Sequence, residues 1–115
     1  MATDLHTFQL VLLRRPDHAT DYDDETTEQI QRDHLAFYEA MRQAGHVVTN
    51  GPVRDQPDKA LRGIAIFATE SVDRAAELAV TDPAVRAGRL DVQVMTWLCR
   101  PGTMIRDGIP VSLPD

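Results

Sequence analysis

Residues 26–45 read TTEQIQRDHLAFYEAMRQAG, and this stretch decides the fold. Apolar residues recur along it at steps of three and four, the spacing of one face of an α-helix. Ile30, His34, Phe37 and Met41 share that face, so we expect the helix to pack on a core with an imidazole inside its apolar stripe. A buried imidazole without a hydrogen-bond partner costs about 1–3 kcal/mol. His34 therefore requires a partner elsewhere in the chain.

The ends of this helix carry recognisable signals. Asp24 or Thr26 is placed to cap its N-terminus, and Gly45 is placed to end it as a left-handed residue. Ser71 caps a second helix, which Pro83 limits because the residue before a proline is pushed away from helical geometry. Apolar runs and alternation predict strands at residues 5–13, 46–49, 63–69 and 90–98.

The resulting order, β-α-β-β-α-β, predicts an α+β fold of the ferredoxin-like type. In this topology a four-stranded antiparallel sheet with strand order 4-1-3-2 carries both helices on one face. The other face is left bare, and the last strand presents to it either Met95 and Trp97 or Val94 and Leu98. A bare apolar face favours a partner, and a second copy related by a twofold axis is the most economical one. We therefore expect a homodimer formed through the open sheet face.

Composition bounds the class of protein. The 115 residues predict one domain, 1–115, with a core at about 5–100 and a C-terminal tail at 101–115. The net charge of −6 argues against nucleic-acid binding, because that function needs a basic surface patch. No apolar run approaches the roughly 18 residues of a membrane span, and no signal peptide is evident. The single cysteine, Cys99, cannot form an internal disulfide, so we expect a cytoplasmic protein with no nucleic-acid or membrane partner.

Asp82 is the candidate partner for His34. It lies at the break after the second helix, and that helix shares a sheet face with the first, so the two side chains can approach. A carboxylate bonded to an imidazole fixes the tautomer and raises the basicity of the ring. Two structural alternatives stay open: a satisfied core histidine, and an Asp that only caps a helix.

The histidines and the single cysteine lack metal-ligand spacing, and no phosphate-binding glycine loop occurs. We therefore expect neither a metal nor an organic cofactor.

The sequence resembles the YCII-related (YciI-like) family over about residues 8–98. The matching positions are His34-Leu35, Gly45, Gly51-Pro52 and Asp82-Pro83-x-Val85-x-Ala87-Gly88. The resemblance implies a dimeric α+β barrel with a site built around a His and an Asp, which match His34 and Asp82. One characterised branch resembles dehydrochlorinases of a chlorinated hydroxyhydroquinone, and the wider superfamily includes muconolactone isomerases. Both reactions move a proton without an organic cofactor.

On this basis we expect a cofactor-independent enzyme of the lyase or isomerase type. His34 would act as the base and Asp82 as its orienting partner, on a small cyclic or aromatic organic acid or phenol. The expected substrate-binding residues are Gly51, Pro52, Arg14 and Tyr38. Two alternatives use the same dimeric scaffold: a non-catalytic small-ligand-binding or regulatory domain, and a cofactor-free oxygenase.

Overall fold

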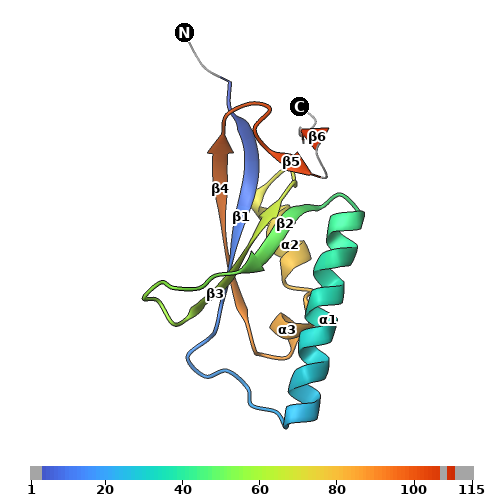
Figure 1. Cartoon of the computed structure of the whole chain (residues 1–115), viewed down its shortest axis with the longest axis vertical. Helices are drawn as coiled ribbons and strands as arrows, with labels where there is room; N and C mark the ends of the chain where they lie inside the picture. Colours follow the sequence, from blue (N-terminus) through green and yellow to red (C-terminus); the bar gives the residue numbers. More distant parts are fainter. Residues whose placement is uncertain (1–3, 107–108, 111–115) are drawn as a thin grey trace.

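A computed structural model describes residues 4–106 and 109–110 of the chain. Its elements are β1 (His6–Arg14), α1 (Asp24–Gln43), β2 (Val47–Pro52), β3 (Leu61–Phe67), α2 (Val72–Ala79), α3 (Pro83–Arg86), β4 (Asp91–Cys99), β5 (Ile105–Arg106) and β6 (Ile109–Pro110). The main sheet has the strand order β2-β3-β1-β4, and each neighbouring pair is antiparallel. The predicted ferredoxin-like α+β topology is confirmed (Figure 1).

The ends of α1 are set by local hydrogen bonds. Asp23 has an extended backbone, and its carboxylate accepts a hydrogen bond from the Thr26 backbone N–H at 2.8 Å. The predicted caps, Asp24 and Thr26, were wrong, because both residues already lie in the first turn. Past the other end, Gly45 has a φ of 87°, the left-handed conformation that the sequence predicted.

The helices cover one face of the sheet (Figure 1). Alternate residues of a strand point to opposite faces, so Val11 and Leu13 of β1 face the helices while Phe8 and Leu10 face away. The core between the helices and the sheet consists of Val11, Leu13, Tyr38, Val47, Ala65, Phe67, Ala75 and Ala79. Through Tyr38, this packing holds the C-terminal half of α1 against the sheet.

The other face of the sheet is only partly covered. It carries a second apolar cluster of Phe8, Val48 and Ile66, against which Met104 packs from the segment that follows β4. Trp97 pairs in register with Phe8 on the same face and is still 40% exposed. Within the described part of the chain, no helix is long and apolar enough to cross a bilayer.

The edge strand β2 is longer than the sequence predicted. We expected it to end at residue 49, but it runs to Pro52 because Asn50 and Gly51 continue the pairing with β3. Proline is tolerated at such a position, on an edge strand. The extension places the Asn50–Pro52 segment opposite the N-terminal half of α1, where the candidate site lies.

Candidate functional site

His34 and Asp82 meet between α1 and the start of α3. The Nδ1 atom of His34 lies 2.7 Å from Oδ2 of Asp82. Asp82 is completely buried, whereas 11% of the His34 side chain is exposed. Asp82 is held in place by its second oxygen, Oδ1, which accepts the Ala84 backbone N–H at 2.9 Å and caps α3. Each oxygen of the Asp82 carboxylate therefore has one hydrogen-bond partner.

The contact assigns the tautomer of His34. A carboxylate only accepts hydrogen bonds, so the proton of the neutral imidazole belongs on Nδ1. The other nitrogen, Nε2, then carries a lone pair, and it has no hydrogen-bond partner among the described residues. A neutral imidazole held in this way is equipped to take a proton at Nε2.

Tyr38 supports the imidazole from the interior. The two rings are in edge contact, with centroids 5.2 Å apart and an interplanar angle of 66°. Burial raises the pKa of the Tyr38 phenol, and the charge of Asp82 raises it further. The Tyr38 hydroxyl is buried without a hydrogen-bond partner in the described part of the chain. Tyr38 thus limits how the His34 ring can turn, and it does so as a neutral phenol.

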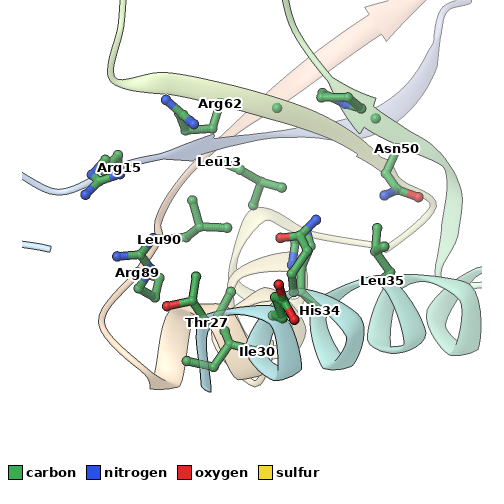
Figure 2. A pocket seen from close by; sticks show the side chains of 16 residues that line it. Leu13, Arg15, Thr27, Ile30, His34, Leu35, Asn50, Arg62, Arg89 and Leu90 are labelled. Atoms are coloured by element: carbon green, nitrogen blue, oxygen red, sulfur yellow. The ribbon is translucent and has the colours of Figure 1, made fainter. Parts of the chain in front are cut away.

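A pocket of about 540 Å³ opens beside His34 (Figure 2). This volume falls in the range of small-molecule sites. The pocket lies between the N-terminal half of α1, the paired ends of β2 and β3, and the segments that follow β1 and α3. Its walls include Ile30, Leu35, Asn50, Gly51, Pro52 and Leu90. An ionisable ring that lines an open, mostly apolar pocket is placed to meet a ligand.

The structure brings together five of the six candidate residues, and three of these line the pocket. His34, Gly51 and Pro52 line the pocket, and Asp82 lies directly behind His34. Tyr38 is 1% exposed and stands behind the imidazole rather than in the pocket wall.

Arg14 is also outside the pocket wall. Its guanidinium donates a 2.8 Å hydrogen bond to the carboxylate of Asp58, and this contact lowers the pKa of Asp58. The neighbouring Arg15 lines the pocket instead. Strand alternation could have pointed to Arg15 in place of Arg14. Leu13 faces the helices, and a residue two positions further along is expected on the same side.

Two further arginines that line the pocket were not among the predicted site residues. Arg62 lies in β3 and Arg89 follows α3, and both line the pocket. No local sequence signal marks Arg89, because only the fold of α3 directs this segment toward α1.

The polar side chains that line the pocket are thus the imidazole of His34, three guanidinium groups, two amides, a hydroxyl and a carboxylate, the last four from Gln31, Asn50, Thr27 and Glu28. Within residues 4–106 and 109–110, no group of three or more His, Cys, Asp or Glu side chains is placed to hold a metal ion.

Comparison with known proteins agrees with this fold. Among solved structures, the chain is similar to 5-chloro-2-hydroxyhydroquinone dehydrochlorinase (TftG) from Burkholderia phenoliruptrix AC1100, determined in complex with 2,5-dihydroxybenzoquinone, with a TM-score of 0.55 and 21% sequence identity. The alignment covers 78% of this chain and 92% of that one. No curated protein matches the chain. The sequence matches the YCII-related domain over residues 8–98, a span that includes His34 and Asp82, and the chain therefore belongs to the YCII-related domain family.

Proposed function

We propose that the protein is a cofactor-independent enzyme of the lyase or isomerase type that acts on a small cyclic or aromatic organic acid or phenol. One observation carries the proposal: the 2.7 Å contact between His34 and Asp82 lies at the wall of an open pocket. A histidine that served only the core would be closed over by apolar side chains. Here the ring nitrogen that Asp82 does not bind is left for a ligand.

In the proposed mechanism His34 moves a proton and Asp82 steadies the ring. Nε2 takes a proton from a carbon or a phenolic oxygen of the substrate, and the carboxylate of Asp82 stabilises the imidazolium that forms. In an elimination, the electron pair of the broken bond to hydrogen forms the new π bond, and the leaving group departs with its own electron pair. In an isomerisation, the imidazolium returns the proton to a different carbon.

The fold neighbour supports the lyase type. That protein is a dehydrochlorinase, and its complex holds a six-membered cyclic ligand. We extend to this chain only the reaction type, because at 21% identity the likeness shows a shared fold and not a shared substrate. Gly51 and Pro52 are proposed as the wall against which the substrate ring lies.

Proton transfer can be tested before any product is identified. The protein is incubated in D2O with a panel of small cyclic and aromatic acids and phenols, and deuterium uptake and turnover are followed by NMR. Substituting His34→Asn should lower the rate on any active compound by about 10²- to 10⁴-fold, the usual contribution of a general base. His18→Asn, the same substitution at an exposed loop histidine, serves as the matched control.

Equal rates for the two variants would refute the catalytic role of His34. Binding of panel compounds without turnover by the wild type would favour the ligand-binding or regulatory alternative. A product that forms only when oxygen is present would favour the oxygenase.

We also propose that two copies pair through the open sheet face. The support is the exposed Trp97 on an apolar face that the helices leave uncovered. Trp97→Glu should convert a dimer to a monomer in sedimentation experiments. Leu98→Glu changes the next residue of β4, which is 52% exposed and points to the opposite face, so it should leave the dimer intact. A monomeric wild type would refute the pairing.

We propose a cytoplasmic location for the protein. The chain has one cysteine, Cys99, and it is free and half-buried, as is usual for proteins of a reducing compartment.

A further inference from the structure

The pocket beside His34 has a positively charged end. Arg15, Arg62 and Arg89 line it and lie together on one side of the pocket in Figure 2, with Asn50 and Leu35 on the other side. They come from three separate segments: the loop directly after β1, the start of β3, and the turn after α3. The chain as a whole has a net charge of −6, so this concentration of positive charge opposes the overall composition.

Two of these arginines are left without a counter-charge. Among the described residues, the side chains of Arg15 and Arg62 have neither a hydrogen bond nor an ion pair. Arg89 differs, because it donates to the Thr20 carbonyl oxygen at 3.0 Å and lies 3.7 Å from the carboxylate of Asp21. Arg89 is thereby held in place, while the guanidinium groups of Arg15 and Arg62 keep their donors for a ligand.

Most of the wall between this charged end and His34 is apolar. Leu13, Ile30 and Leu90 line the intervening part of the pocket (Figure 2). Among the described residues that line the pocket, Glu28 is the only acidic one, and it is exposed on α1. A ligand that satisfied both ends would carry an anionic group at one end, an apolar ring or chain in the middle, and its reactive atom next to the imidazole.

We propose that the substrate is a carboxylate, and that Arg15 and Arg62 bind its charged group while His34 acts on the far side of the molecule. This inference rests on the function proposed above and narrows it from acids and phenols to acids. A carboxylate is ionised at neutral pH and matches the forked donors of a guanidinium, whereas a simple phenol is neutral there and offers a single oxygen. Arg15 and Arg62 determine specificity and take no part in the proton transfer.

The test compares two probes of the same shape. Benzoate and benzamide differ in charge but hardly in size, and their affinities can be measured by NMR titration of the 15N-labelled protein. Wild type should bind benzoate at least tenfold more tightly than benzamide, and added salt should reduce the difference. Arg15→Gln and Arg62→Gln should each weaken benzoate binding by about tenfold or more and leave benzamide binding unchanged, since each removes a charge-assisted hydrogen bond.

Arg54→Gln is the matched control, because Arg54 is exposed in the β2–β3 loop and does not line the pocket. The inference would be overturned if the two probes bound equally well, or if wild type did not bind benzoate at millimolar concentrations. It would also be overturned if Arg54→Gln lost as much benzoate binding as the other two variants. His34→Asn separates it from the proposed function. Benzoate selectivity that survives in this variant without any turnover by the wild type would refute catalysis alone. Turnover that depends on His34 but favours neutral phenols would refute the carboxylate assignment alone.

Discussion

Substituting Asp82→Asn tests the tautomer of His34 directly. Asp82 accepts two hydrogen bonds at once, from the Ala84 backbone N–H at 2.9 Å and from Nδ1 of His34 at 2.7 Å. An asparagine side chain has one accepting oxygen and one donating NH2 group, so it cannot accept both. If the oxygen stays on the Ala84 N–H, the amide donates to Nδ1, and the imidazole proton moves to Nε2. The lone pair on Nε2, which the proposed mechanism requires, would then be lost.

The structural cost of the change can be worked from the same contacts. Replacing a charge-assisted hydrogen bond by a neutral one should lower the free energy of unfolding by about 1–2 kcal/mol. Asp82→Ala removes the helix cap, at about 1 kcal/mol, and leaves the buried Nδ1–H of His34 unpaired, at about 1–3 kcal/mol. The Ala variant should therefore lose about 2–4 kcal/mol, a large share of the roughly 5–15 kcal/mol that stabilises a typical domain.

Two measurements check this reasoning. Long-range 15N–1H correlation spectra identify which imidazole nitrogen is protonated, and urea unfolding gives the stability. Asp33→Asn is the control, because Asp33 is exposed on α1 and its side chain contacts only Gln29 among the described residues, so the substitution should change the stability by less than about 0.5 kcal/mol. The reasoning fails if the proton stays on Nδ1 in Asp82→Asn, or if Asp82→Ala is no more destabilising than the control.

Three further perturbations follow from the packing and the titrating groups. Tyr38→Phe removes a buried hydroxyl that has no hydrogen-bond partner among the described residues, so the variant should be at least as stable as wild type at pH 8. Because burial raises the pKa of Tyr38 above 10.0, wild type should lose stability as the pH rises past about 10, and the Phe variant should lose less. Urea unfolding midpoints measured from pH 8 to 11 would show the difference. Gly63→Ala should lower the free energy of unfolding by about 1–3 kcal/mol, because an added Cβ would lie 2.9 Å from the Gly51 backbone oxygen. In the control Gly51→Ala, the added Cβ meets nothing within 4 Å, so the loss of stability should be smaller. Similar melting temperatures for the two variants would contradict this prediction. The hydrogen bond from Thr26 lowers the pKa of Asp23 below 3.8. The ionised carboxylate therefore stabilises the fold above that pH, and this stabilisation is lost as the pH falls through the lowered pKa. Asp23→Asn keeps an accepting oxygen but does not titrate, so its Tm should decline less steeply between pH 5 and 2.

Much of the fold was predictable because its signals are local. The helical face with Ile30, His34 and Phe37 depends on residues three and four apart, and the end of α1 depends on the left-handed Gly45. Once the order of strands and helices was clear, chain topology placed the second helix on the same sheet face as the first, so that the segment after it could reach α1. The contact between His34 and Asp82 then followed from an unsatisfied imidazole and an acidic residue at the one break that could reach it.

The positions that were missed depend on register and on close approach. Whether Arg14 or Arg15 points into the pocket is a matter of one residue, because adjacent side chains of a strand face opposite sides. The cap at Asp23 differs from the predicted ones by only one or three residues, and several polar residues in that loop have similar capping tendencies.

By itself, the sequence determined the elements, their order, and the presence of an imidazole that needs a buried partner. It did so because period, caps and turns are properties of residues close together in the chain. Only the tertiary structure decided that the contact lies beside an open pocket, and that Arg15, Arg62 and Arg89 line that pocket. The physical reason is that the pocket is the space left between segments far apart in the chain, and its shape depends on how α1 packs over the ends of β2 and β3.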